Sequence, residues 1–202
     1  MKLYYTTASP YARKVRVLMH EKAVGDVELV SVNPFDMTDD LTGVNPLSKV
    51  PALVLNDGSV LFDSTVICEY LDASHAPAGR FFASGDPARW PLLRSYALAK
   101  GLMDICVGLA LETRRRPQDL RSPQWINQLC ANMTRSINSL EVEIDNFGPD
   151  IDIAQIATGC ALGYVDARAL EYVTWRRDNP KLMAWFERFG QRPSMLATQP
   201  PV

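Results

Sequence analysis

Two neighbouring stretches of the chain carry groups that could bind a peptide-like anion. Pro51 stands where a short apolar run begins, and the first residue of a strand is one of the few places in a sheet that tolerates proline. Proline pushes Val50 before it toward extended geometry, so the main-chain groups of Val50 are candidates to face outward, unpaired by the sheet. Asp63 and Ser64 open a helical pattern, and the free N–H groups and hydroxyls at a helix N-terminus form a site for a carboxylate.

The residues between these stretches predict a β-hairpin. Residues 52–55 form an apolar run of strand length, residues 56–58 (Asn-Asp-Gly) have turn chemistry, and residues 60–62 form a second short run. The apolar spacing after the hairpin predicts a helix from residue 64 to about 73. The two candidate binding stretches therefore flank one hairpin.

The N-terminal part of the chain predicts a small mixed sheet with helices packed on it. Ser9 is typical of a helix N-cap and Pro10 of the first helical position. The order is β-α-β-(α)-β-β-α. The elements before the hairpin are a strand over 3–5, a helix from 10 to near 25, a strand over 27–32 and an irregular or weakly helical segment over 35–44.

Beyond residue 86 only helical periodicity remains. Asp152, followed by Gln155, resembles a capping box, and the helix it opens carries no charge from residue 153 to 165, which predicts a buried centre. The helices expected run from 86 to the basic run over 114–116, from 123 to about 148, from 153 onward, and from 180 to 190, with one further turn in the tail over 192–202.

Composition limits the classes of function. A formal net charge of −2 gives no electrostatic reason to expect nucleic acid or an anionic membrane as partner. The first residues lack the apolar segment of a signal peptide, and no apolar run reaches transmembrane length. The cysteines are far apart without a C-x-x-C motif and the two histidines have no clustered partners, so we expect no metal site and free, buried thiols in the cytoplasm. These residues are Cys68, Cys106, Cys130, Cys160, His20 and His75.

Two basic clusters are interpreted structurally. Arg13, Lys14 and Arg16 are expected to form a solvated or domain-contacting helix face. The run over 114–116 suits the C-terminus of a helix, and we favour that reading over a binding patch.

In this order and spacing, the chain resembles the soluble glutathione transferase superfamily, and most closely its small bacterial members whose first helix begins with Ser-Pro. The resemblance covers nearly the whole chain. The matching residues are Ser9-Pro10-Tyr11-Ala12-Arg13-Lys14-Val15, Asn45-Pro46-Leu47-Ser48-Lys49-Val50-Pro51-Ala52-Leu53, Asp63-Ser64, Asp152, Asn179-Pro180 and Arg192-Pro193-Ser194.

The resemblance implies a fold and an assembly. It implies a thioredoxin-like, glutathione-binding domain over 1–76, a linker over 77–85 and an all-helical domain over 86–202. It further implies a cytoplasmic homodimer with a role in detoxification, in which Asp104 could reach the glutathione ammonium group of the other subunit.

The resemblance also implies a glutathione site. The residue matching Pro51 is cis in the family, and the main chain of Val50 would pair with the cysteinyl part of glutathione. Ser64 and its helix N-terminus would take the γ-glutamyl carboxylate, Asp63 would suit the ammonium group, and Lys49 could reach the glycyl carboxylate.

The catalytic requirement is an ionised thiol. A thiol with a pKa of about 8.5 is mostly protonated at neutral pH, and the thiolate is the nucleophile. Ser9 is the matching hydroxyl; it would donate a hydrogen bond that favours the thiolate and would not itself attack. Because Pro10 has no N–H, main-chain donation must come from Tyr11 or Ala12.

Other hydroxyls compete for this role. Tyr5, Thr6 and Thr7 lie near the same strand end, and some classes of the family use a tyrosine in this region, so Tyr5 is the second choice. Ser9 alone could be only an N-cap.

Three functions are compatible with these residues. The first is conjugation of glutathione to a small hydrophobic electrophile, or the related reduction of peroxides or disulfides. The second is a non-catalytic binding or regulatory protein with the same fold. The third is a thiol–disulfide reductase that uses bound glutathione and no protein cysteine. The electrophile is not identified by the sequence.

Overall fold

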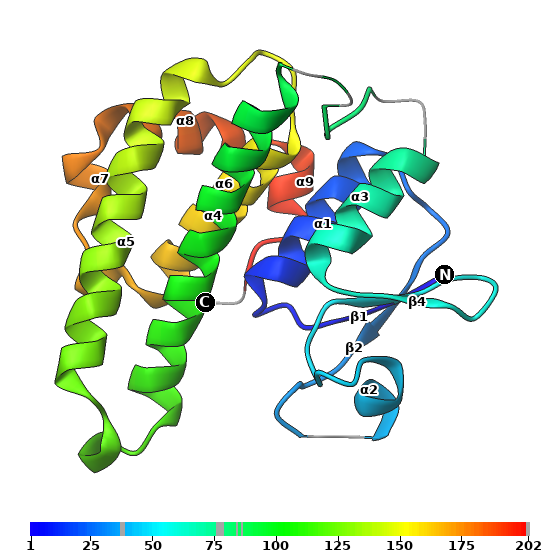
Figure 1. Cartoon of the computed structure of the whole chain (residues 1–202), viewed down its shortest axis with the longest axis horizontal. Coiled ribbons are helices and arrows are strands. Elements are labelled where there is room, and N and C mark those ends of the chain that lie inside the picture. Colours follow the sequence, from blue (N-terminus) through cyan, green and yellow to red (C-terminus); the bar gives the residue numbers. More distant parts are fainter. Residues whose placement is uncertain (37–38, 76–78, 84, 86, 201–202) are drawn as a thin grey trace. The chain divides into compact units, whose positions relative to one another are not determined.

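The computed structural model describes residues 1–36, 39–75, 79–83, 85 and 87–200, and its chain divides into two compact units (Figure 1). One unit comprises Met1–Phe82 with the tail from Pro193, and the other comprises Ala83–Arg192. Residues 76–78, 84 and 86, which the sequence assigns to the domain end, the linker and the start of a helix, lie outside the described residues.

The first unit contains a four-stranded sheet in the order β2-β1-β3-β4. β1 pairs with β2 in parallel, while β3 pairs antiparallel with both β1 and β4, which confirms the predicted mixed sheet and hairpin. The strands are β1 (Lys2–Tyr5), β2 (Glu28–Ser31), β3 (Ala52–Val54) and β4 (Val60–Leu61).

Helices cover this sheet. α1 (Pro10–Glu21) and α3 (Ser64–Ser74) lie side by side on one face, while α2 (Asp39–Val44) lies toward the other (Figure 1). Apolar side chains from the sheet and from the two neighbouring helices are fully buried and form the core of this unit. They include Leu3, Leu53, Val15, Leu18, Ile67 and Leu71.

Of the two readings of the basic residues on α1, solvated or domain-contacting, the solvated one does not hold for two of the three residues. Arg13 is 6% exposed and Lys14 is fully buried. The Arg13 guanidinium donates a hydrogen bond to the carbonyl oxygen of Met195 at 3.1 Å, in the short helix α9 (Pro193–Leu196). The tail, which the sequence assigns to the helical domain, groups with the first unit, where α9 lies against α1.

The second unit is helical in every described element, as predicted. The helix starts predicted at residue 123 and at Asp152 are confirmed, since the side chains of Ser122 and Asp152 accept hydrogen bonds from the amides of Trp125 and Gln155 at 3.2 and 2.8 Å. Residues 153–165 are all buried, which confirms the predicted central helix. The main helices are α4 (Arg89–Ala110), α5 (Pro123–Glu143), α6 (Ile153–Arg168), α7 (Trp175–Asp178) and α8 (Pro180–Gly190), and a π-helical turn (Leu111–Arg115) extends α4.

The start of α8 is fixed by a residue that sequence reasoning missed. The Glu141 carboxylate of α5 accepts hydrogen bonds from the amides of Lys181 and Leu182 at 3.1 and 2.6 Å. Asn179, at the position before the helix, instead bonds the side chain of Asn138. A cap supplied from another helix leaves no local pattern in the sequence.

Candidate functional site

The sheet register brings the sequence-predicted binding residues to one end of the first unit. Tyr4 pairs with Ala52, and Leu53 pairs with Leu61. Extending both ladders by one or two residues places Pro51 between the end of β1 and Asp63, with strands about 5 Å apart. The loop before α1, the loop before β3 and the start of α3 therefore meet at this end of the sheet.

Ser9 is the N-cap of α1, as predicted. Its side-chain oxygen accepts a hydrogen bond from the amide of Ala12 at 3.2 Å, and its own amide donates to the carbonyl oxygen of Thr6. A hydroxyl that accepts through its oxygen still has its proton to donate. Ser9 can therefore cap the helix and donate a hydrogen bond to an anion at the same time.

The competing hydroxyls have different surroundings. Tyr5, at the end of β1, lies beneath the guanidinium of Arg16, which is 5.0 Å from the ring centroid. Burial lowers the pKa of Arg16, and its guanidinium remains close to Tyr5. Thr7 is exposed in the turn after β1, and Tyr11 is half-buried in the first turn of α1. The structure does not assign catalysis to any of them, so the roles of Ser9 and Tyr5 remain predictions.

The loop before β3 presents an unpaired stretch of main chain. The peptide bond between Val50 and Pro51 is cis. Among the described residues, the main-chain groups of Val50 have no hydrogen-bond partner, as expected for a residue that lies outside the ladder of β3. Lys49 is exposed beside it.

Asn45 holds this loop in place, a role that sequence reasoning missed. Its side-chain oxygen accepts from the amide of Leu47 at 3.0 Å, and its amide nitrogen donates to the carbonyl oxygen of Lys49 at 2.8 Å. The first contact is an Asx turn, which an asparagine before a proline could have indicated. Asn45 thereby fixes the backbone that leads into Val50.

The start of α3 has the strongest indication of a ligand. Asp63 is the N-cap and accepts from the amide of Thr65 at 2.8 Å, while its side chain stays exposed. Ser64 is only 1% exposed, and its hydroxyl has no hydrogen-bond partner within the described structure. Because a buried polar group without a partner costs free energy, this hydroxyl at a helix N-terminus is a candidate to bind a carboxylate.

Asp104 lies on α4 in the second unit and is about half exposed. Its carboxylate is 3.7 Å from the ammonium group of Lys100, one helical turn away. A contact of Asp104 across a subunit interface remains a prediction.

The cysteines are free, but one prediction about them is wrong. Cys68, Cys106 and Cys160 are buried, whereas Cys130 is partly exposed. Burial raises the pKa of the Cys106 thiol to about 12 and also raises that of Cys130. Within the described ranges, no three His, Cys, Asp or Glu side chains are grouped to hold a metal ion.

We expect Cys130 to be the cysteine that iodoacetamide modifies in the native protein. The thiolate is the reactive form, so a raised pKa makes its reaction slow at pH 7 and faster as the pH rises. Mass spectrometry of peptides from native and unfolded protein measures this. Rapid labelling of Cys106 at neutral pH would contradict the expectation.

Comparisons with known proteins match both parts of the chain to one protein family. Residues 8–74 match the family model "Glutathione S-transferase, N-terminal domain", and residues 123–188 match "Glutathione S-transferase, C-terminal domain". The Escherichia coli K12 protein named "Uncharacterized GST-like protein YibF" is 32% identical over 100% of this chain and 99% of its own length.

Solved structures give the same result. A glutathione transferase family member from Pseudomonas fluorescens Pf-5, solved with bound glutathione, is 41% identical with a TM-score of 0.95, over 100% of this chain and 99% of that one. A second structure of it holds S-(propanoic acid)-glutathione. A glutathione S-transferase from Methylobacillus flagellatus KT with glutathione bound is 33% identical with a TM-score of 0.91, over 99% of both chains. The chain therefore belongs to the glutathione S-transferase family.

Among the residues that the structure describes, none of the helices combines the length and apolar character needed to cross a membrane.

Proposed function

We propose that this protein is a glutathione transferase that binds glutathione on its first unit and transfers the thiolate to a small hydrophobic electrophile. The observation that carries this proposal is the buried, unpaired hydroxyl of Ser64 at the N-terminus of α3. It lies at the same end of the sheet as the N-cap Ser9 and the unpaired main chain of Val50. The glutathione bound to the Pseudomonas and Methylobacillus relatives supports the same ligand.

Each charged part of glutathione has a proposed partner. The main chain of Val50 pairs with the cysteinyl residue, in the manner of an added strand. Ser64 and the N–H groups of α3 take the γ-glutamyl carboxylate, and Asp63 takes its ammonium group. Lys49, which is exposed, reaches the glycyl carboxylate.

Catalysis consists of keeping the sulfur ionised and correctly placed. The thiol proton leaves to solvent, while the Ser9 hydroxyl donates a hydrogen bond to the thiolate and the N-terminus of α1 favours its charge. The thiolate then forms a carbon–sulfur bond with the electrophile, and with an aryl halide the halide ion leaves. Reduction of peroxides or disulfides would begin from the same thiolate.

Calorimetry with reduced glutathione tests the proposal first. We expect saturable binding by the folded protein. Steady-state assays with an aryl halide, a hydroperoxide and a mixed disulfide then distinguish conjugation from the two reductions. Binding without turnover of any of them would favour a non-catalytic binding or regulatory protein, and the absence of binding would contradict the proposal.

Ser64→Ala should change stability and affinity in opposite directions. Removing a buried hydroxyl that has no partner should leave the unbound protein equally stable or more stable, by up to about 1 kcal/mol. Glutathione should bind about tenfold more weakly, because its carboxylate loses a donor. Thermal unfolding and calorimetry measure the two effects. Thr65→Ala, at the next position of the same helix turn, is the control, and unchanged affinity in Ser64→Ala would remove this contact from the site.

We further propose a cytoplasmic homodimer in which Asp104 of one subunit approaches the ammonium group of glutathione in the other. Free cysteines support a reducing compartment. The exposure of Asp104 leaves its carboxylate accessible for such a contact.

A further inference from the structure

Arg13 of α1 is a buried cation whose charge is poorly compensated. The residue is 6% exposed. Its guanidinium donates one hydrogen bond, to the carbonyl oxygen of Met195 at 3.1 Å, while its Nε atom is buried without a hydrogen-bond partner. Within the part of the chain that the structure describes, no carboxylate forms an ion pair with Arg13. A buried charge costs free energy unless it is paired, and one carbonyl contact is a weak substitute for a carboxylate.

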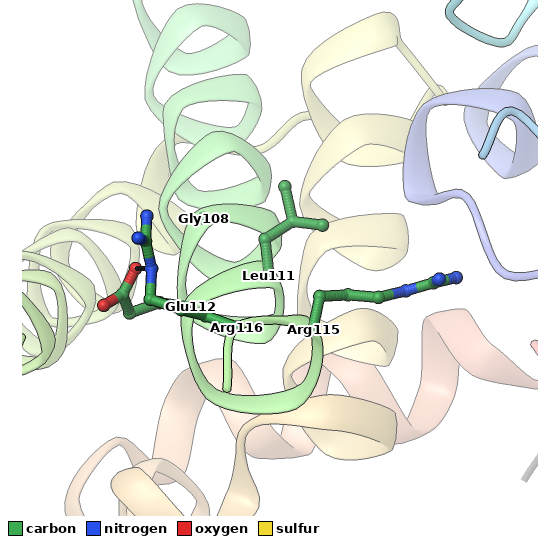
Figure 2. Close-up of a pocket in the computed structure, with 5 residues that line it drawn as sticks. All are labelled: Gly108, Leu111, Glu112, Arg115 and Arg116. Atoms are coloured by element: carbon green, nitrogen blue, oxygen red, sulfur yellow. Dashed lines mark hydrogen bonds and ion pairs between the residues drawn. The ribbon is translucent and has the colours of Figure 1, made fainter. Parts of the chain in front are cut away.

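An arginine of the second unit shows the more usual arrangement. The side chain of Arg116 is 52% exposed, and its Nε atom nevertheless lies 2.8 Å from a carboxylate oxygen of Glu112. Figure 2 shows this ion pair on one side of the turn that ends α4, with Leu111 and Arg115 on the other side. Arg116 thus has both solvent and a carboxylate to compensate its charge, whereas the described residues give Arg13 neither.

Arg13 lies one helical turn after Ser9. Its amide donates to the carbonyl oxygen of Ser9 at 3.0 Å, and residues four apart on a helix have β-carbons about 5–6 Å apart on the same face. Side chains on a helix lean toward its N-terminus, so the side chain of Arg13 leans toward the turn that Ser9 caps. The helix dipole also places positive charge at this end of α1. The Ser9 hydroxyl therefore lies near two sources of positive potential.

The other charged residues of α1 leave this potential positive. Arg16 lies near Arg13: burial lowers the pKa of Arg16, and the charge of Arg13 lowers it further. Lys14 is also basic and is fully buried. Glu21 is the last residue of the helix, and it accepts a hydrogen bond from the Ser194 hydroxyl at 2.5 Å. The first turns of α1 consequently carry more positive than negative charge.

The elements around α1 also leave Arg13 without an anion. The tail over residues 193–200, which includes α9, contains no ionisable side chain. Tyr5 of β1 lies against Arg16, and Asp72 of α3 is held by Lys22 at 2.7 Å. The other acidic residues of α3 and its N-cap are exposed, namely Asp63 and Glu69. An anion that compensates the buried charge would have to come from outside the described residues.

We propose that Arg13 stabilises the thiolate of glutathione bound beside Ser9, through its charge and without touching the sulfur. This inference rests on the proposed function, because it requires glutathione at Ser9. Ser9 donates the hydrogen bond to the sulfur, and Arg13 adds a positive charge one turn away. The tail contributes in two ways: the carbonyl oxygen of Met195 fixes the guanidinium, and burial keeps water from screening its charge.

Ultraviolet titration of the thiolate of glutathione bound to the full-length protein tests this role. Arg13→Met removes the charge and should raise the pKa of the bound thiol by about 0.5–1, the effect of one unit charge at several ångströms and intermediate dielectric. The rate of conjugation at neutral pH should fall about threefold to tenfold, and the two proteins should approach the same rate at high pH. Arg13→Lys keeps the charge and should retain most of the unaltered behaviour.

Two controls separate the charge of Arg13 from its contact with the tail. Ser194→Ala removes the hydrogen bond between the tail and Glu21 and changes no charge. Lys2→Gln removes an exposed positive charge from the same unit. Both should give the thiol pKa of the unaltered protein. Binding of S-methylglutathione, which has no thiol to ionise, should be unchanged in Arg13→Met.

Thermal unfolding verifies that each variant is folded. If Arg13→Met does not fold, Arg13→Gln, which is neutral and can still donate to the carbonyl oxygen of Met195, takes its place with the same expected result. An unshifted thiol pKa in the folded neutral variant, or an equal shift in Ser194→Ala, would overturn the inference and leave the proposed transferase function intact. An unaltered protein that binds no glutathione would contradict both.

Discussion

Replacing Lys22 by methionine is expected to lower the free energy of unfolding by about 3–5 kcal/mol, because it breaks a buried ion pair and leaves one charge without its partner. Lys22 follows α1, and its ammonium group lies 2.7 Å from the carboxylate of Asp72 in α3, with both side chains at most 2% exposed. The ammonium group also donates to the carbonyl oxygens of Asp72, His75 and Gly79. One side chain therefore joins the end of α1 to the end of α3 and to the segment that follows it.

Asp72 makes two further hydrogen bonds in the same cluster. Its two carboxylate oxygens accept hydrogen bonds from the amides of Phe81 and Phe82 at 2.9 and 3.0 Å. Without Lys22 these two contacts alone would have to compensate a buried negative charge. Urea unfolding of the variant measures the loss of stability.

Lys2→Met is the matched control. Lys2 also pairs with a carboxylate, that of Glu28, at 3.2 Å, but both side chains are more than half exposed. Such pairs contribute about 0–1 kcal/mol. If the two lysine variants lost equal stability, the buried Lys22–Asp72 pair would contribute no more to the stability of this unit than an exposed pair does.

The Lys22–Asp72 ion pair is a part of the fold that the sequence could not predict. N-caps and strand patterns are local, and the helix starts at Ser9, Ser122 and Asp152 followed from a few adjacent residues. Lys22 and Asp72 are separated by fifty positions, and nothing near either residue distinguishes a buried lysine from a solvated one.

The same limit applies to α1. The basic residues Arg13 and Lys14 after the N-cap suit either a solvated face or one that contacts another part of the chain, and the local pattern does not decide between the two. Arg13 is buried because the distant tail passes over it and offers the carbonyl oxygen of Met195. Burial by a segment 182 residues away has no counterpart in local sequence.

More of the candidate site than of these long-range contacts could be predicted from the sequence, because the parts of the site are short local motifs. Val50-Pro51 and Asp63-Ser64 each signal their geometry within two residues, and the hairpin between them fixes their spacing. The buried, unpaired hydroxyl of Ser64 could not be predicted, since a helix-start serine usually satisfies its own hydroxyl. Asn45 was also missed, because its effect on Val50 depends on the path of the loop.

Ser9→Asp is expected to leave the protein folded but to lower the rate of glutathione conjugation about hundredfold or more at neutral pH. Aspartate caps a helix about as well as serine, so the contact with the Ala12 amide and the stability of α1 should be retained, within about 0.5 kcal/mol. The aspartate carboxylate, however, has no proton to donate and places a negative charge beside the thiolate. Both effects disfavour the ionised sulfur and raise its pKa.

The pH dependence separates this explanation from a structural one. If Ser9 lowers the pKa of bound glutathione below about 8.5, the rate of the unaltered protein rises with pH through that lowered value and levels off above it. In Ser9→Asp the rise should move to higher pH, and ultraviolet titration of the bound thiolate should move with it. Binding of S-methylglutathione, which has no thiol to ionise, should change little.

Two further variants complete the comparison. Ser9→Thr keeps both the cap and the donor and should retain most of the rate, whereas Ser9→Ala should lose much of the rate and about 1 kcal/mol of stability with the cap. Thiolate formation would then follow the presence of a donor rather than the stability of α1. A Ser9→Asp protein with an unshifted pH profile and an unchanged rate would show that Ser9 is only a helix cap, and Tyr5, beneath the guanidinium of Arg16, would become the hydroxyl to test.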